Sequence, residues 1–181
     1  MSGPQYVGMV LEAFQTEPQS EYIPVYANAS EYDVGTVYLY VDDPLYSTVT
    51  TGTDIALSGA LGHVNGKCTR IDPEEKESSN YEGKNYCQFI YSFYDEYGEV
   101  EAQLSAEGPI QMSRFGVSLL PITGGTEFFR RSVGSVVLYP AMITEDDPPV
   151  VEWGTFLDVP SSFLMETYLW LDESLIPPGL L

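Results

Sequence analysis

The chain has few cysteines, histidines and basic residues, the residue types on which many functional sites depend. Its 181 residues include two cysteines and one histidine, and 7 lysines and arginines stand against 27 aspartates and glutamates. Such small numbers of cysteine and histidine exclude a disulfide scaffold and a zinc cluster, so we expect no metal. The formal net charge of −20 repels phosphate backbones and anionic headgroups, which excludes nucleic acid as a partner.

Long apolar runs are missing too. Each run is short and ends at a Gly, Pro or Asp, and none approaches the roughly 18 residues that a membrane helix needs. We therefore expect no membrane insertion. Residues 1–5 contain no basic segment followed by an apolar run, so no signal peptide is expected. The location stays open between the cytoplasm and an organelle, such as a plastid, that has removed a presequence.

Short runs of aromatic and β-branched residues are what the chain has in quantity. Aromatic residues make up 13% of it, and no linker is long enough to separate domains. The spacing predicts an all-β fold, a single antiparallel β-barrel of about eight strands without helical crossovers. Strands are expected over residues 22–29, 34–41, 55–71, 86–94, 99–107, 115–121 and 132–139, with residues 6–14 as a first strand or lead-in.

Three segments divide the chain. We predict a lead-in over residues 1–20, the barrel over 21–140, and an acidic, proline-rich loop with a final element over 141–181. In that final element, residues 163–171, Leu, Met and Glu favour a helix while the aromatic and β-branched residues favour a strand. Composition leaves both alternatives open.

Two local patterns are sharper. Residues 99–107 alternate polar and apolar side chains, which predicts a strand with one wet and one buried face. Its buried positions would be Val100, Ala102, Leu104 and Ala106, and the two alanines would leave room inside a barrel. Further on, Gly124-Gly125 separates two apolar runs and predicts a tight hairpin connection that uses positive φ.

The sequence Asp42-Asp43-Pro44 supplies the candidate acids. Pro44 cannot donate to a ladder and is expected to end its strand. A carboxyl group at an apolar barrel mouth can protonate a quinone methide, epoxide or enone oxygen, or stabilise a cation when ionised. The alternative is turn chemistry, in which the Asp side chains cap backbone N–H groups.

Cys68 and Cys87 share one face of two consecutive predicted strands. If these strands pair as a hairpin, the two residues lie nearly opposite each other. Three alternatives follow, namely packing as free cysteines, a cross-strand disulfide, or a reactive thiol, of which packing is the commonest role for a buried cysteine. His63 faces away from Cys68 by the same parity and is assigned a structural or surface role, and Arg130-Arg131 a surface role.

Five motifs occur in an order that resembles the dirigent and allene oxide cyclase superfamily of small β-barrels. They are Asp42-Asp43-Pro44-Leu45, the glycine-rich 62–66, Asn65-Gly66-Lys67-Cys68, Tyr91-Ser92-Phe93-Tyr94, and Gly124-Gly125-Thr126 with Gly134. The resemblance covers about residues 22–140. It implies a trimer of barrels, each with an apolar cavity and no cofactor, and it favours a strand over residues 163–171.

The resemblance also implies site residues. Cys68 and the strand 91–94 would line the pocket, and Asp43 stands at the acidic position of dirigent proteins. Asn28 and Ser30 stand where plant cyclases carry a Glu that stabilises a developing cation, and Cys87 stands where they carry a Phe. The aromatic residues Tyr26, Phe89, Tyr91 and Phe93 share the inward parity of Asn28 and Cys87, as core residues or as ligand contacts.

Two functions are compatible with these residues. In the first, the barrel binds a hydrophobic small molecule and directs its cyclisation or coupling as an isomerase- or cyclase-like protein. Its catalytic residues would be Asp43, Asp42 and Cys68, and its ligand-binding residues Tyr26, Asn28, Ser30, Cys87, Phe89, Tyr91 and Phe93. In the second, the barrel is not catalytic and serves as a binding module or a structural subunit of a larger assembly.

Overall fold

The computed structural model describes residues 5–15, 23–24, 33–51, 54–72, 83–112, 116–144, 150–152 and 162–178. The strands are β1 Tyr6–Gln15, β2 Val37–Thr51, β3 Asp54–Asp72, β4 Gly83–Tyr94, β5 Val100–Met112, β6 Ser118–Gly125, β7 Val133–Ile143, β8 Val150–Glu152 and β9 Ser162–Asp172. Two short 3₁₀ helices, η1 Glu127–Phe129 and η2 Glu173–Leu175, follow β6 and β9. Within these ranges, no helix has the length and apolar character needed to cross a membrane.

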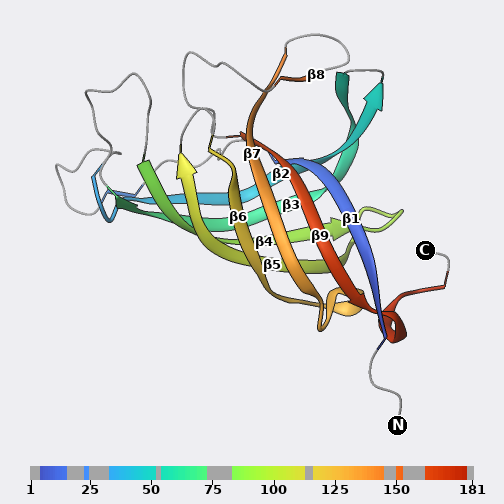
Figure 1. Cartoon of the computed structure of the whole chain (residues 1–181). Coiled ribbons are helices and arrows are strands. Elements are labelled where there is room, and N and C mark those ends of the chain that lie inside the picture. Colours follow the sequence, from blue (N-terminus) through green and yellow to red (C-terminus); the bar gives the residue numbers. More distant parts are fainter. Residues whose placement is uncertain are drawn as a thin grey trace.

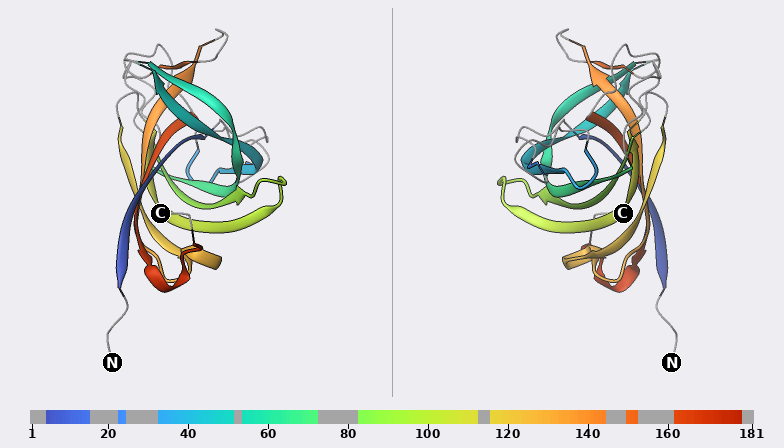
Figure 2. Two further views of the ribbon diagram at one scale, coloured as in Figure 1. Left: turned by 90° about the vertical axis from the view of Figure 1, so that its right-hand side faces the viewer. Right: turned by 90° about the vertical axis from the view of Figure 1, so that its left-hand side faces the viewer.

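Eight of the strands close into a ring. Antiparallel neighbours run in the order β2-β1-β9-β7-β6-β5-β4-β3, and β3 pairs again with β2. Figure 1 shows the curved, tilted strands of this ring, and the end views of Figure 2 show them wrapping round a common axis. The predicted fold, a single antiparallel barrel of about eight strands, is confirmed.

Strand β9 resolves the ambiguous residues 163–171. It pairs along its length with β1 on one side and with β7 on the other. Phe163, Met165, Leu169 and Leu171 alternate along it and are buried in the core. The ring needs a strand here to satisfy the facing edges of β1 and β7, and this tertiary requirement overrides the helix preference of Leu, Met and Glu.

Strand β8 was not predicted. It has three residues and bridges β3 and β7 outside the ring. A second, smaller core forms there, where Val151 packs with outward side chains of neighbouring strands such as Phe14, Ile55 and Leu164. A strand this short contains no period that a sequence pattern can detect.

Alternate side chains of the eight ring strands point inward and form the main hydrophobic core. The predicted alternation of β5 is correct for Ala102, Leu104 and Ala106, which are buried, and wrong for Val100, which is exposed where the strand begins. In the register of β4 and β5, Ala102 faces Phe93 and Ala106 faces Phe89. The alanines therefore make room for aromatic rings of the neighbouring strand.

Two predicted strand ends are corrected. Pro44 does not end its strand, because β2 continues to Thr51 through a bulge between Tyr40 and Asp43, a place where a proline is tolerated. The pair Gly124-Gly125 closes β6 without positive φ, and the turn instead places Glu127 and Arg131 in that region. Glycine is required at 125 because a Cβ there would collide with Phe129.

Other predicted segments fall where little is described. Of the strand predicted over residues 22–29, the structure describes residues 23 and 24, and Ile23 forms a bridge with Val37. The proposed boundaries of lead-in, barrel and final segment remain a prediction, although β1 takes a full place in the ring between β2 and β9.

Cys68 and Cys87 form a disulfide between β3 and β4. They are direct partners in the register of the two strands, with their Cα atoms 4.0 Å apart. The predicted hairpin register is thus confirmed. The favoured alternative, two free cysteines that pack, is wrong, because direct opposition brings the two sulfur atoms within bonding reach.

The two 3₁₀ helices lie next to each other at the ends of β6 and β9. Phe129 of η1 turns inward and its ring lies 5.3 Å from that of Phe93. At the end of β9, Asp172 accepts hydrogen bonds from the backbone N–H and the hydroxyl of Ser174, and Arg131 lies 3.5 Å from its Oδ2. The Ser174 hydrogen bonds, helped by Arg131, lower the pKa of the Asp172 carboxyl.

Removing the disulfide should destabilise the barrel. The cysteines are 19 residues apart in sequence, and opening a loop of that size costs about 2–4 kcal/mol, or about 5–15 °C in Tm. We expect this loss in the double variant Cys68→Ala/Cys87→Ala, measured by thermal unfolding. The unreduced native protein, unfolded in guanidinium, should take up no iodoacetamide. Alkylation of both cysteines without a reductant would show that the bond does not form.

The contribution of Asp172 to the free energy of unfolding should depend on pH. The pKa of the Asp172 carboxyl is lower in the folded than in the unfolded chain. The ionised carboxylate therefore stabilises the fold fully at pH values above the unfolded-state pKa, and this stabilisation is lost as the pH falls through the folded-state pKa. The difference in unfolding free energy between the native chain and Asp172→Asn should therefore shrink from pH 7 to pH 3. Urea titrations measure it, with Glu173→Gln as the exposed neighbouring control. An equal difference at both pH values contradicts the role of the charge.

Candidate functional site

Asp43 lies inside the barrel and Asp42 outside it. The side chain of Asp43 is fully buried on β2, where it faces Val64 of β3 in the register. The side chain of Asp42 is 74% exposed. The barrel wall thus separates the two predicted acids, and only Asp43 is placed where a molecule inside the barrel would meet it.

Tyr91 and Gln15 form a hydrogen-bonded polar pair in the same interior as Asp43. Tyr91 of β4 neighbours Val64 on the side away from Asp43, and its hydroxyl donates to Oε1 of Gln15 across the barrel, 3.3 Å away. Gln15 is fully buried and pairs with Leu45, two residues beyond Asp43 on β2. Burial, followed by the nearby Tyr40, raises the pKa of Tyr91, so its hydroxyl stays protonated at neutral pH.

Two buried polar atoms in this interior still have hydrogen-bonding capacity. Within the described ranges, neither Nε2 of Gln15 nor Oγ1 of Thr167 meets a hydrogen-bond partner, and both side chains are fully buried. Thr167 is the partner of Leu11 on β1. Buried polar atoms are nearly always paired, so a donor of this kind is a group that a bound molecule's oxygen can satisfy.

The Tyr91–Gln15 pair lies next to other aromatic rings. The rings of Tyr40 and Phe89 meet edge to face at 5.0 Å, and those of Phe89 and Tyr91 lie 5.8 Å apart. The three predicted ligand-binding aromatics of β4, Phe89, Tyr91 and Phe93, therefore all point inward. They contact one another and the rest of the hydrophobic core, so they act as core and as inner wall at once.

The remaining predicted site residues divide into two groups. Cys68 and Cys87 are buried on the inner face, but their sulfur atoms are bonded to each other, so Cys68 has no thiol to act as a nucleophile while the disulfide is intact. Tyr26, Asn28 and Ser30 lie outside the described residues.

Sequence reasoning missed Gln15 and a buried arginine. Arg70 shares the inward parity of Cys68, donates to the Tyr38 hydroxyl at 2.8 Å and lies over that ring, 5.6 Å from its centre. Parity alone would have identified Arg70 as inward. Gln15 carried no such signal, because the predicted strand or lead-in ends at residue 14, and Gln15 was assigned to the polar loop that follows it.

The outer face carries a cluster around the single histidine. Nε2 of His63 lies 3.7 Å from Oδ1 of Asp42, and its Nδ1 shares a 2.9 Å hydrogen bond with the hydroxyl of Tyr94. Asn65 joins the cluster through two hydrogen bonds to Asp42. The assignment of His63 to the outer face is confirmed, and the bulge in β2 explains why its acidic neighbour was not foreseen.

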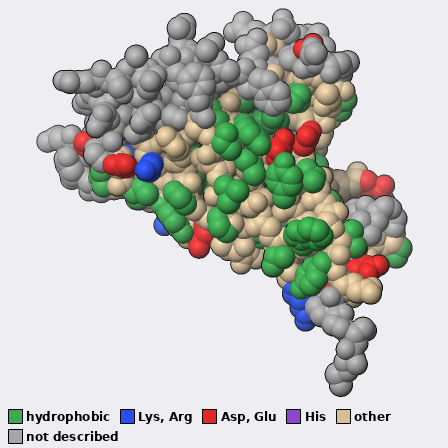
Figure 3. Space-filling model, in the orientation of Figure 1, with side chains coloured by type: hydrophobic (Ala, Val, Ile, Leu, Met, Phe, Trp, Pro, Cys, Tyr) green, Lys and Arg blue, Asp and Glu red, His purple; other side chains and the backbone are tan. Residues whose placement is uncertain are grey.

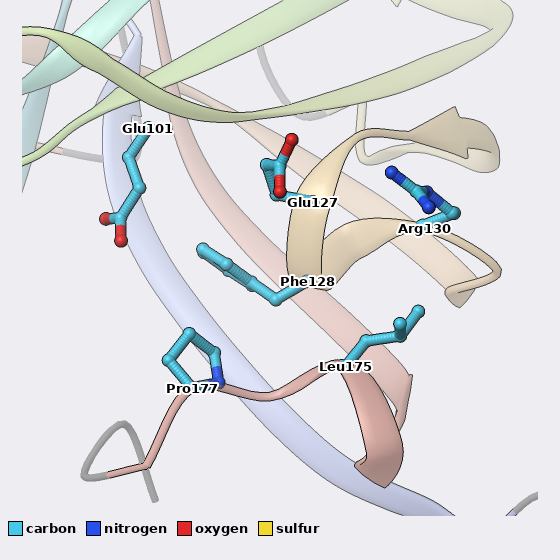
Figure 4. A pocket seen from close by; sticks show the side chains of 6 residues that line it. All are labelled: Glu101, Glu127, Phe128, Arg130, Leu175 and Pro177. Atoms are coloured by element: carbon cyan, nitrogen blue, oxygen red, sulfur yellow. The ribbon is translucent and has the colours of Figure 1, made fainter.

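A cavity of about 280 Å³ opens beside the two 3₁₀ helices. Figure 4 shows the Phe128 side chain between Glu101 of β5 and the C-terminal Leu175 and Pro177. Glu127 and Arg130 complete its lining. None of the predicted site residues lines this cavity, and it mixes charges of both signs without a buried polar group.

The described residues hold no group of three or more His, Cys, Asp and Glu side chains that are arranged for a metal ion. The interior contains the carboxyl group of Asp43, the hydroxyl of Tyr91 and the amide of Gln15, together with aromatic rings. Such a set can bind an apolar molecule, donate hydrogen bonds to its oxygen atoms, and exchange a proton with it or stabilise a cation.

Comparison with known proteins places the fold. No family model matches the chain, and no curated protein matches it in sequence. Two solved structures of dirigent proteins do match in structure. The pterocarpan synthase dirigent protein GePTS1 superposes with a TM-score of 0.58 at 16% identity, covering 94% of this chain and 90% of that one. The pterocarpan synthase dirigent protein PsPTS1 gives 0.58 at 18% identity, covering 95% and 97%. This chain has the dirigent-type β-barrel fold.

Proposed function

We propose that this barrel binds a hydrophobic small molecule in its interior and directs the cyclisation or coupling of that molecule without a cofactor. Asp43 carries the proposal, because it is a carboxyl group fully buried in the aromatic-lined interior of a dirigent-type barrel. Removing a carboxyl group from water costs several kcal/mol unless it is compensated. Fully buried ionisable groups in folded proteins cluster at functional sites.

The surroundings of Asp43 define its chemical role. In an apolar interior a carboxyl group either donates a proton to a reacting oxygen or, once ionised, stabilises a developing cation more strongly than it would in water. The inward rings of Phe89 and Tyr91, tilted by 44° to each other, carry negative π density on their faces, which suits a cationic aromatic intermediate. The Nε2 donor of the Gln15 amide favours a ligand with an oxygen acceptor.

The structural neighbours support an enzymatic reading of this kind. Both dirigent proteins are named as pterocarpan synthases, so proteins that form a small-molecule product occur on this fold. The identities of 16% and 18% carry over the fold, and the substrate of this chain must be found by experiment.

A second candidate function is that of an assembly subunit, and the outer face of β6, β7, β9 and β1 favours it. Figure 3 shows hydrophobic side chains gathered on this face. The exposed apolar residues of these four strands are Leu119, Val133, Met142, Tyr168, Trp170, Tyr6 and Val10. Apolar patches of this kind mark contact surfaces, so we propose that the barrel forms a trimer or joins a larger assembly through them.

Replacing Asp43 should separate catalysis from binding. We would identify the substrate by mass spectrometry of small molecules that co-purify with the native protein. Asp43→Asn keeps the side-chain shape and removes the ionisable proton, so turnover of that compound should fall by about 10²–10⁴-fold. Binding of the neutral fluorescent probe N-phenyl-1-naphthylamine should change by less than about threefold, because the aromatic wall is untouched.

Asp72→Asn is the matched control. It makes the same chemical change at an exposed position on β3 and should leave turnover and probe binding unaltered. If Asp43→Asn turns over the compound at the native rate, the acid role is wrong. If the probe does not bind either protein and no compound co-purifies, the barrel holds no apolar ligand and the assembly role stands alone.

The trimer has its own test. Light scattering at micromolar concentration should give about 60 kDa, three times the chain mass of 20.1 kDa. Trp170→Glu, which places a charge on the proposed contact face, should yield monomers, whereas Ile90→Glu on β4, at a similarly exposed position, should not. A monomer mass for the native chain would reject self-association.

A further inference from the structure

We infer that Asn65, on the outside of the barrel, is a positioning residue that holds the β2 bulge and thereby aims Asp43 into the interior. The functional part of this inference rests on the proposed role of Asp43. The geometric part stands on the register of β2 and β3 and on the hydrogen bonds of Asn65.

The bulge decides which acid is inside. Tyr40 pairs with Gly66 and Asp43 with Val64, so two residues of β2, Val41 and Asp42, stand opposite the single Asn65 of β3. In an unbroken strand side chains alternate, and with Tyr40 inward, Asp42 would point inward and Asp43 outward. The extra residue reverses this parity. Tyr40 and Asp43 are both buried, and Val41 and Asp42 both face solvent.

The bulge requires a backbone conformation that must be held in place. Asp42 has a φ of 51°, in the left-handed region that L-residues rarely adopt. Asp tolerates this region better than most residues, but it still costs on the order of 1 kcal/mol. Neighbouring contacts have to offset this cost if the parity is to stay reversed.

Asn65 provides those contacts in a reciprocal pair. Its Oδ1 accepts from the backbone N–H of Asp42 at 3.0 Å, and its Nδ2 donates to Oδ1 of Asp42 at 2.9 Å. The first bond fixes the backbone of the bulged residue and the second fixes its side chain. His63, itself bonded to Tyr94 of β4, stands 3.7 Å from the same Oδ1 and adds a second, weaker support.

An amide is the side chain that this geometry needs. The backbone N–H of Asp42 requires an acceptor and its carboxylate requires a donor, and an Asn side chain presents one of each in a single plane. A carboxylate at position 65 would keep the acceptor but lose the donor, and it would stand against the carboxylate of Asp42.

Three variants test the inference. Asn65→Asp removes the donor at constant size. The double variant Asn65→Asp/Asp42→Asn exchanges the two groups, so both hydrogen bonds return with one of them reversed. Gln88→Glu is the matched control, because Gln88 donates to Glu107 at 2.8 Å on the outer face of β4 and β5, and the change creates the same carboxylate pair away from the bulge.

Two readouts do not depend on catalysis. In the native chain we expect NOEs between the Asp43 β-protons and the Val64 methyl groups, and slow hydrogen exchange at the Asp42 amide. Asn65→Asp should lose those NOEs and exchange the Asp42 amide at least about tenfold faster. The double variant should restore both, and Gln88→Glu should retain both. Turnover of the co-purified compound should follow the same order, with a loss of at least about tenfold that the exchange repairs.

The outcomes separate this inference from the proposed function. An Asn65→Asp protein that keeps the Asp43–Val64 NOEs and native exchange overturns the positioning role, whatever happens to turnover. If Asn65→Asp fails to fold, Asn65→Ala removes the pair without adding charge, and intact NOEs in that variant overturn the role equally. If the NOEs follow the expected order while Asp43→Asn retains full turnover, the bulge is held as inferred and the proposed catalytic role of Asp43 is wrong.

Discussion

Strand parity in a closed barrel is the constraint on which the rest of this structure depends. Because eight strands close into a ring, each residue of β2, β3 or β4 faces either the interior or the outer surface. A shift of one residue exchanges the two faces. The bulge at Val41 and Asp42, one of three irregularities in the β2–β3 register, makes such a shift and brings Asp43 and Leu45 inside.

Contacts between neighbouring strands keep each side chain on its own face of the barrel wall. Ala102 and Ala106 of β5 stand opposite Phe93 and Phe89 of β4, so large rings occupy the space left by small side chains. The disulfide between Cys68 and Cys87 fixes the β3–β4 register two residues away from Phe89. With β3 fixed against β4, Asn65 is held opposite the bulge, and its bonds to Asp42 act on a backbone that cannot slide.

The interior combines this rigidity with a costly group of polar side chains. Asp43, Gln15 and Tyr91 lie where burial opposes charge, and the Tyr91–Gln15 hydrogen bond offsets part of the desolvation of those two side chains. A barrel selected for stability alone would fill these positions with apolar residues. Their presence beside inward-facing aromatic rings supports a chemical role for the interior, in agreement with the function proposed for Asp43.

The sequence alone determined the features that follow from local periodicity. The alternation of β5, the inward rings of β4, the facing positions of Cys68 and Cys87 and the barrel architecture all follow from side chains that repeat every second residue. The resemblance to dirigent barrels rested on motifs in the same strands, and the structural neighbours agree with it in fold.

Only the tertiary structure decided the features that depend on contacts between distant segments. Residues 163–171 became a strand because β1 and β7 both needed a partner, and β8 exists because β3 and β7 converge on it. Asp42 and Asp43 are adjacent in sequence, and although the resemblance singled out Asp43, periodicity does not show which of the two points inward. Asn65, 23 residues further along the chain, holds the bulge that places one outside and the other inside. A bulge interrupts the period from which sequence reasoning works, so the side of the wall on which each acid lies becomes known only when the strands are paired.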